Sequence, residues 1–257
     1  ERVRGTDEAD SMTAAGLTTG VRFEGMAAAD SLTGGAGDDT LDGGAGDDVI
    51  AAGAGNDDIT GGAGTDTVFG GAGFDTVDHT AAPGAVTVDL GAGTAAQDGH
   101  GDSDNLFGIE GVRGSGFADT LLGDGGNNRL SGEGGADRLE GLGGSDELVG
   151  GAGNDTVLGG AGMDVLQGDA GDDLLQAGDG DDFLVGGAGE DIIDGGDGFD
   201  LIEYAAAAGA VVANLATGTA QDGDGGTDSF TGIEELRGSS FGDALWGDGD
   251  ANILSGN

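Results

Sequence analysis

Aspartate recurs at every ninth position in two long stretches of this chain, and that spacing is its strongest chemical signal. Five nonapeptides follow one another over residues 34–78, and ten more cover residues 114–203. Most follow the pattern Gly-Gly-x-Gly-x-Asp-x-aliphatic-x closely, as in "GGAGDDTLD", and we number these places 1–9. Carboxylates in so strict a phase can bind cations wherever the fold brings two of them together. Place 6 is held by Asp39, Asp48, Asp57, Asp66, Asp75, Asp119, Asn128, Asp137, Asp146, Asp155, Asp164, Asp173, Asp182, Asp191 and Asp200.

The elements that must position these aspartates are short strands and glycine turns. Place 8 is Leu, Ile or Val in all fifteen nonapeptides, and a flexible acidic linker has no reason to keep that phase. Places 7–9, such as Thr40-Leu41-Asp42, alternate polar, apolar and polar, which is typical of a strand with one buried face. Glycine at places 1, 2 and 4 permits positive φ and tight turns. Two turns and two strands predict one coil of eighteen residues, and coils stack at roughly 4.8 Å as parallel strands around a thin aliphatic core.

Stacking brings the turns of nonapeptides n and n+2 together, so that Asp39 pairs with Asp57 and Asp155 with Asp173. Paired carboxylates repel one another unless a cation lies between them. Carboxylate and carbonyl oxygens suit Ca²⁺, whereas zinc would favour Cys or His, and the chain has no Cys and two His. The pairing predicts three sites in the first run and eight in the second, so roughly eleven ions. The carbonyls that complete the sites are expected from glycines at places 2 and 4, among them Gly35, Gly37, Gly44, Gly46, Gly151, Gly153, Gly160, Gly162, Gly187 and Gly189.

Composition excludes several classes of function. The chain has 257 residues, 63 of them glycine, with 50 acidic residues, seven arginines and a formal net charge of −43. Without a cation, such a chain is expected to be disordered, because little apolar burial opposes its ordering entropy and charge repulsion. Nucleic acid is excluded as a partner, since phosphate binding needs clustered Lys and Arg. No apolar run is long enough for a transmembrane segment.

The nonapeptides resemble the GGxGxDxUx repeats of the RTX (repeats-in-toxin, haemolysin-type) calcium-binding family. "GGAGDDVIA", "GGAGTDTVF", "GGAGNDTVL" and "GGAGEDIID" match that pattern place for place. The resemblance implies an all-β fold, a right-handed parallel β-roll, with place-6 aspartates as ligands and turn carbonyls completing each shell. It also implies export from a Gram-negative bacterium by type I secretion machinery. The chain would then stay unfolded at the low calcium of the cytoplasm and fold outside the cell. Asn128 at place 6, and Asp124, Glu133 and Leu142 at place 2, depart from the pattern and predict weaker sites.

The segments between the runs form a second, larger repeat. Residues 84–132 reappear as residues 209–256, and they resemble the flank of such repeats in the serralysin C-terminal domain. The residues Glu1–Gly5 align with residues 110–114 and 234–238, so we expect a fragment of a longer tandem array. The domains predicted are the end of a preceding module with degenerate repeats (1–33), a first block (34–78), an inter-block β segment (79–113), a second block (114–203), a second inter-block segment (204–237) and a truncated third block (238–257).

Several residues outside the repeats invite chemical interpretation. His79 aligns with Tyr204, which favours aromatic packing over catalysis. The acidic loops 98–104 and 222–228 form either an extra calcium site or a solvated loop, and the solvated loop is favoured. The candidate ligands are Asp98, Asp102 and Asp104 in the first loop and Asp222, Asp224 and Asp228 in the second. Ion pairs are expected between Glu110 and Arg113 and between Glu234 and Arg237. The aromatic residues Phe74, Phe199, Phe117 and Phe241 are expected to cap the core ends, and Trp246 to pack.

These features predict a non-catalytic, secreted calcium-binding protein. The chain contains no HExxH motif, no G-x-S-x-G elbow and no lysine for a P-loop. Three functions remain open: a calcium-folded export module, a structural array such as an S-layer or adhesin, and an accessory domain of a secreted protease, lipase, epimerase or toxin. The tandem of large modules favours the long surface or matrix protein. Besides calcium and the secretion machinery, cell-surface polysaccharide or self-association are the partners considered.

Overall fold

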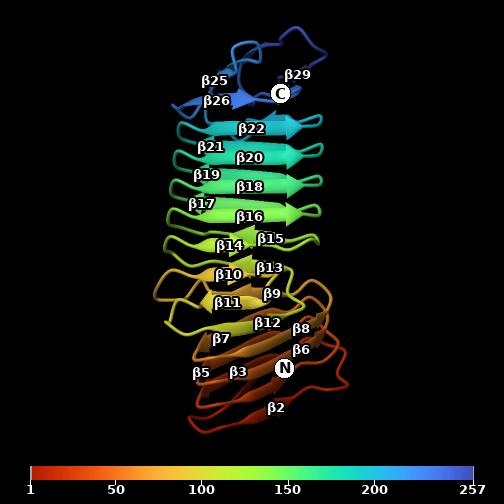
Figure 1. Ribbon diagram of the computed structural model, residues 1–257, viewed down its shortest axis with the longest axis vertical. Coiled ribbons are helices and arrows are strands. Elements are labelled where there is room, and N and C mark those ends of the chain that lie inside the picture. The colour runs from red at the N-terminus through yellow and green to blue at the C-terminus, as the bar shows by residue number, and fades with distance from the viewer. Residues whose placement is uncertain (1, 257) are drawn as a thin grey trace. The chain divides into compact units, whose positions relative to one another are not determined.

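The computed structural model describes residues 2–256 as short β-strands joined by turns, with no helix in that range. The chain divides into two compact units, Glu1–Gly123 and Asp124–Asn257. Each unit is a right-handed parallel β-roll, in which the chain alternates between two facing sheets (Figure 1). The prediction of an all-β parallel β-roll is therefore confirmed. Glu1, which aligns with Glu110 and Glu234, lies outside the described residues.

The first unit has two sheets whose strands alternate along the chain. One sheet has the order β1 (Arg2–Arg4), β3 (Arg22–Ala27), β5 (Thr40–Ala45), β7 (Asp58–Ala63), β9 (Thr76–Asp78) and β13 (Gly111–Arg113). The other has the order β2 (Ser11–Thr13), β4 (Ser31–Thr33), β6 (Val49–Ala54), β8 (Thr67–Ala72), β12 (Asp104–Phe107), β11 (Thr94–Gln97), β10 (Thr87–Asp89) and β14 (Thr120–Leu122).

The second unit repeats the arrangement, and Figure 1 shows β16, β18, β20 and β22 stacked in one file. One sheet has the order β15 (Arg129–Ser131), β17 (Glu147–Ala152), β19 (Val165–Ala170), β21 (Phe183–Ala188), β23 (Leu201–Glu203), β27 (Glu235–Arg237) and β29 (Ile253–Ser255). The other has β16 (Arg138–Gly143), β18 (Thr156–Ala161), β20 (Leu174–Asp179), β22 (Ile192–Asp197), β26 (Thr227–Thr231), β25 (Thr219–Gln221), β24 (Val212–Asn214) and β28 (Ala244–Trp246).

The strand register confirms the eighteen-residue coil. In the regular repeats each strand pairs in parallel with the strand eighteen residues later, as Leu41 pairs with Ile59 and Leu148 with Leu166. Place 8 therefore stacks on place 8 along each sheet. The place-8 side chains of all fifteen nonapeptides are at most 2% exposed, from Leu41 to Ile202. The thin aliphatic core predicted from the phase of place 8 is confirmed.

The strands are longer than the three-residue pattern indicates, and the glycines divide into two roles. A typical strand runs through places 7–9 and on into places 1–3 of the next nonapeptide, as β5 does. Gly44 at place 2 and Gly46 at place 4 have φ of 103° and 134°, so these places need the left-handed region. Gly43 at place 1 is not in that region, which corrects the prediction of positive φ for place 1. It is required for close approach instead, as described below.

The inter-block segments are inserted into one sheet of each roll as an antiparallel meander. In the first unit β10 and β11 pair antiparallel, as do β11 and β12, while β12 pairs in parallel with β8 and β10 with β14. In the second unit β24, β25 and β26 form the same arrangement. The other sheet continues without interruption from β9 to β13 and from β23 to β27. These segments therefore form strands that extend one sheet of each roll.

The arginines pair within the chain, though not always with the expected partners. Arg113 pairs with Asp58 and Asp78, and Arg237 with Glu235 and Glu203. The expected Glu110–Arg113 and Glu234–Arg237 pairs are therefore wrong. The arginines lie on strands and meet acids on strands, whereas the two glutamates turn into the roll and accept backbone N–H groups.

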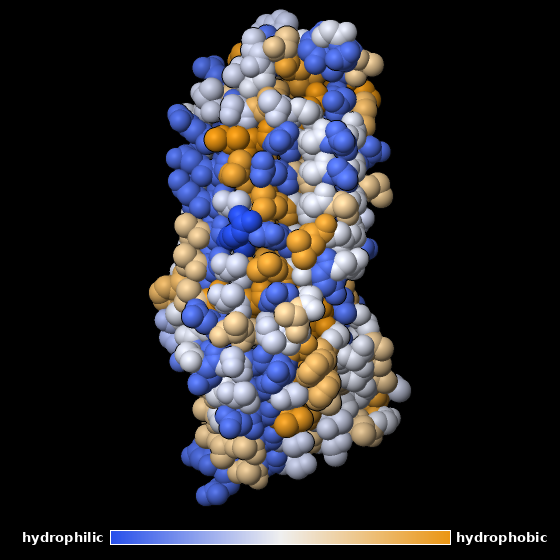
Figure 2. All heavy atoms as spheres, in the orientation of Figure 1, coloured by the Kyte–Doolittle hydropathy of each residue, from blue (hydrophilic) through white to orange (hydrophobic). Residues whose placement is uncertain are grey.

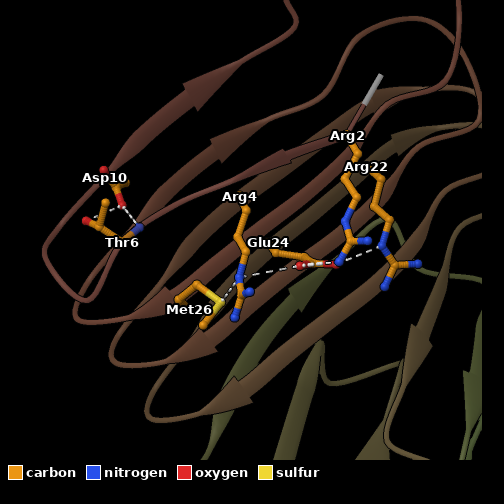
Figure 3. A network of polar contacts seen from close by, with 7 residues as sticks. All are labelled: Arg2, Arg4, Thr6, Asp10, Arg22, Glu24 and Met26. Carbon is orange, nitrogen blue, oxygen red and sulfur yellow. Dashed lines mark hydrogen bonds and ion pairs between the residues drawn. The ribbon is translucent and has the colours of Figure 1, made fainter.

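A cluster of arginines on β1 and β3 surrounds a single glutamate. Figure 3 shows Arg2, Arg4 and Arg22 directed towards Glu24, with Arg2 Nη2 and Arg22 Nε lying 2.8 and 3.0 Å from Glu24 Oε1. Hydrogen bonds from Arg2 and Arg22 hold the pKa of Glu24 below its ordinary value. The glutamate therefore offsets one of the three positive charges gathered here.

Large apolar side chains on the surface correct the prediction of aromatic caps. Phe117, Phe199 and Phe241 are 47%, 39% and 49% exposed, so they do not close a core end. Trp246 is 51% exposed, which also corrects the expectation that it packs. Phe199 stands at place 5 of its turn, where neighbouring residues also face solvent. Tyr204 is buried, as its predicted packing role requires. Figure 2 shows apolar residues scattered among hydrophilic ones on the face drawn, and no described helix could span a membrane.

Candidate metal centre

The place-6 side chains of each unit stack into two rows, which we name the aspartate columns. In each column the Oδ1 atom of one aspartate accepts the N–H of the place-6 residue eighteen residues earlier. The distance is 2.7 Å from Asp39 N to Asp57 Oδ1 and 2.8 Å from Asp155 N to Asp173 Oδ1. The other bonds of this kind in the regular runs join residues 48 to 66, 57 to 75, 128 to 146, 137 to 155, 146 to 164, 164 to 182, 173 to 191 and 182 to 200. The stacking of n with n+2 is confirmed as geometry.

The second carboxylate oxygen of most column aspartates is buried and has no hydrogen-bond partner. The Oδ2 atoms of this kind belong to Asp48, Asp57, Asp66, Asp75, Asp146, Asp155, Asp164, Asp173, Asp182, Asp191 and Asp200. These residues are at most 3% exposed. Burying an ionised carboxylate oxygen without a partner is costly, so each of these atoms calls for a cation or a proton.

At most place-1 glycines the Oδ2 atom lies beside a backbone carbonyl of the next coil. A Cβ atom built on Gly43 would lie 2.4 Å from Asp48 Oδ2 and 2.6 Å from the Gly61 carbonyl oxygen. Gly168 gives 2.3 Å to Asp173 Oδ2 and 2.5 Å to the Gly186 carbonyl. Place 1 also drops out of the strand ladder, since the register passes from Asp42–Thr60 directly to Gly44–Gly62. At Gly43 and Gly168 a Cβ atom would therefore clash in this space, which a carboxylate and a carbonyl oxygen border together.

Burial makes the charged form of these carboxylates unfavourable in the metal-free fold. It raises the pKa of Asp48, Asp57, Asp146, Asp191 and Asp200 to about 6. It raises the pKa of Asp173 to about 7, and the charges of the neighbouring column aspartates Asp191 and Asp155 raise it further. Cation binding would relieve both the burial penalty and this mutual repulsion.

Acid should therefore partly replace the cation. The pKa of these groups is higher in the metal-free roll than the ordinary value of 3.8, so their penalty is absent below about pH 4 and complete above about pH 7. We expect chelator-treated protein to gain β-structure as the pH falls from about 7 to about 4, measured by far-UV circular dichroism at low protein concentration. A spectrum that is independent of pH, or β-structure that increases with pH, would contradict the sign of this linkage.

The donor set fits calcium. Within residues 2–256 no three or more His, Cys, Asp or Glu side chains converge tightly enough to hold a metal alone. Backbone carbonyls must then supply much of any coordination shell, as carboxylates and carbonyls do for Ca²⁺. The chain has no Cys for a thiophilic metal, and the stacked oxygens are hard ligands.

The named turn glycines mostly adopt the expected conformation. Gly44, Gly46, Gly151, Gly153, Gly160, Gly162, Gly187 and Gly189 have φ between 103° and 146°. Gly35 and Gly37 do not have positive φ, which corrects the expectation for the first turn. That turn packs on residues 14–20, an irregular segment: Gly35 lies against the Leu17 carbonyl and Gly37 against the Thr19 backbone. Metal binding by any of these carbonyls stays a prediction.

Three place-6 positions differ from the rest. Asp39 Oδ2 accepts the Gly35 N–H at 2.7 Å, and Asp119 Oδ2 accepts from Ser115. Asn128 accepts the Asp124 N–H through Oδ1 at 2.8 Å. In these three turns a place-6 side-chain oxygen accepts a hydrogen bond from its own turn, whereas in most other turns the equivalent oxygen has no partner.

The columns continue beyond the regular repeats, through aspartates outside the two nonapeptide runs. Asp10 N donates to Asp30 Oδ1 and Asp30 N to Asp48 Oδ1, both at 2.7 Å. Asp66 N donates to Asp104 at 2.8 Å, and Asp191 N to Asp228 at 3.2 Å. Each newly placed aspartate precedes an apolar residue by two positions, so the short pattern Asp-x-apolar would have found them.

The comparison with known families agrees with this geometry. A family model described as RTX calcium-binding nonapeptide repeat (4 copies) matches residues 22–50, 42–77, 113–148, 140–175 and 167–202, more than half of the chain. The chain belongs to the RTX calcium-binding repeat family. Nonapeptide repeats of this family bind calcium. No curated protein matches the chain.

Proposed function

We propose that this RTX chain is a non-catalytic region of a secreted bacterial protein that is disordered without calcium and folds when calcium binds outside the cell. The buried Oδ2 atoms of the aspartate columns carry this proposal. A fold that aligns so many carboxylates without internal partners gains its stability from an external cation. The net charge of −43 adds repulsion that the same cations would reduce.

The proposed ligands are the place-6 aspartates, together with the turn carbonyls of places 2 and 4 and the carbonyl that borders place 1. Asn128 occupies the same position with a neutral oxygen. Roughly eleven ions would fill the regular repeats, one between each stacked pair. Further ions are expected where the columns continue through Asp30, Asp104 and Asp228.

The cellular setting follows from calcium-dependent folding. A chain that stays unfolded at the low calcium of the cytoplasm can pass through a type I secretion channel of a Gram-negative bacterium, and millimolar calcium outside would fold it. The larger repeat, residues 84–132 and again residues 209–256, supports a long tandem surface or matrix protein. The proposed boundaries are 1–33, 34–78, 79–113, 114–203, 204–237 and 238–257.

Resistance to a protease tests this function under both conditions. We expect complete digestion at submicromolar free calcium and a resistant core covering both blocks at millimolar calcium, because cleavage needs unfolded chain. Millimolar Mg²⁺ is the control, and it should protect poorly because it demands a small octahedral shell. Equal digestion with and without calcium would contradict the proposal.

A further inference from the structure

The acidic loops of the inserted meanders each contain one carboxylate that the roll has enclosed. Asp98 follows β11 and is 1% exposed, and Asp222 follows β25 and is 0% exposed. Both lie outside the segments matched by the RTX repeat model. Their loop neighbours Asp102 and Asp224 are exposed. The same acidic position is therefore buried in both inter-block segments, 79–113 and 204–237, outside the nonapeptide repeats.

In each buried carboxylate, one oxygen accepts three hydrogen bonds and the other accepts none. Asp222 Oδ1 accepts the N–H groups of Asp224, Gly225 and Gly226 at 2.9, 3.0 and 3.0 Å. Asp98 Oδ1 accepts three N–H groups of residues 100–102 in the same way. The Oδ2 atoms of Asp98 and Asp222 are buried and have no hydrogen-bond partner. In the first loop His100 Nδ1 lies 3.8 Å from Asp98 Oδ2, beyond hydrogen-bond distance.

The two loops adjoin the coils that carry Asp66 and Asp191. The strand after the Asp98 loop, β12, pairs with β8, which directly follows Asp66, and the strand after the Asp222 loop, β26, pairs with β22, which directly follows Asp191. A Cβ atom built on Gly226 would lie 1.7 Å from the Gly189 carbonyl oxygen and 2.8 Å from Asp222 Oδ2. Asp222 Oδ2 therefore lies close to the turn carbonyl of Gly189, two residues before the column aspartate Asp191.

Beside Asp66 and Asp191 the carbonyl oxygen found in the regular coils is absent. At Gly43 and Gly168 the carbonyl of the next coil borders the space beside the column Oδ2 atom. At Gly61 and Gly186 the three nearest atoms all belong to the column aspartate, Asp66 or Asp191, and no carbonyl is among them. The chain enters the next coil from a meander there, and the Gly99 and Gly223 carbonyls lie against Gly84 and Gly209 instead.

We propose that Asp98 and Asp222 each bind a calcium ion together with the column aspartate beside them, Asp66 or Asp191, where the regular coils use a carbonyl. The inference rests on the proposed calcium dependence of the columns for the identity of the ion. An added carboxylate raises the charge of the ligand set, which favours tighter Ca²⁺ binding than at a regular coil. The ion would also fix the meander against the roll.

Binding at the Asp222 site can be followed by luminescence, because a tyrosine lies nearby. The hydroxyl of Tyr204, the one tyrosine of the chain, donates to Asp228 Oδ2 at 3.0 Å, and Asp228 bonds to Asp191 N. Tb³⁺ substitutes for Ca²⁺ at oxygen sites and luminesces when a nearby tyrosine is excited. In a Trp246→Phe background, which removes the one tryptophan, we expect Tb³⁺ emission sensitised by Tyr204.

The Asp222→Asn variant decides the proposal, with Asp224→Asn as the matched control in the same loop. Asparagine keeps the Oδ1 acceptor for the three N–H groups and removes the charge. We expect the sensitised emission to be lost in Asp222→Asn and retained in Asp224→Asn, with circular dichroism at saturating calcium the same in both. Retained emission in Asp222→Asn would overturn the proposal.

The Asp98 loop allows a second, independent test of the proposal. Equilibrium dialysis of Asp98→Asn should show one Ca²⁺ fewer per chain than Asp102→Asn, and equal numbers would overturn the proposal for that loop. If neither control variant binds calcium or folds with it, the proposed function fails as well. If the controls bind and fold while both Asn variants retain their ions, only the present inference fails.

Discussion

Replacing Gly153 by alanine is expected to destabilise the second unit by about 3 kcal/mol or more. Gly153 stands at place 4 with φ of 142°, and a Cβ atom there would lie 1.3 Å from the Gly135 carbonyl oxygen. That oxygen is backbone of the neighbouring coil and has no freedom to move without unstacking the turn. The alanine must therefore strain its own backbone and separate two coils at once.

The measurement is urea unfolding at saturating calcium, compared with Gly125→Ala in the same unit. Nothing lies within 4 Å of a Cβ atom built on Gly125, so its substitution should change stability by no more than about 0.5 kcal/mol. Because stacked repeats can unfold in parts, hydrogen exchange of neighbouring coils should accompany the midpoint. Equal midpoints for the two variants would show that the turns do not stack as closely as described.

The second large effect is expected from Asp173→Asn, in the middle of a column. Asp173 Oδ1 accepts the Asp155 N–H and its own N–H donates to Asp191, so it takes part in the stacking on both sides. Asparagine keeps the acceptor but removes one negative charge from the two sites the residue would share. We expect calcium affinity at these sites to fall at least tenfold, about 1.4 kcal/mol each, measured by calorimetric titration.

The control is the preceding residue of the same turn. Asp172 is exposed at place 5, and its Oδ1 accepts the Glu190 N–H at 3.0 Å, a bond that asparagine can also make. Asp172→Asn should leave the number and affinity of bound ions unchanged. If both variants bind calcium like the unchanged chain, the column aspartates are not the ligands.

The period of the sequence was sufficient to predict the coil, the core and the stacked aspartates. Because places 6 and 8 both recur every nine residues, few ways of stacking the coils keep both in line. The observed pairing of Leu41 with Ile59, eighteen residues later, is the one expected. The period could not reveal why place 1 is glycine. Its φ is unremarkable at Gly43, and the requirement comes from Asp48 Oδ2 and a carbonyl of another coil.

Features without the period were harder to predict. Asp104 and Asp228 enter the columns only because a meander returns the chain to the same sheet, and sequence spacing does not encode that return. The arginine pairs were wrong because Arg113 meets Asp58 across strands, 55 residues away in sequence. Substitutions at place 2 proved compatible with the turn, since Glu133 and Leu142 adopt φ of 70° and 74°.

The central claim is that calcium in the aspartate columns folds the chain. Far-UV circular dichroism at neutral pH, recorded in excess chelator and then during titration with calcium, tests it most directly. We predict a disordered spectrum in chelator and a cooperative change to β-structure by millimolar calcium, reversed when chelator is restored. A β-rich spectrum in excess chelator, or a disordered one at millimolar calcium, would contradict the account.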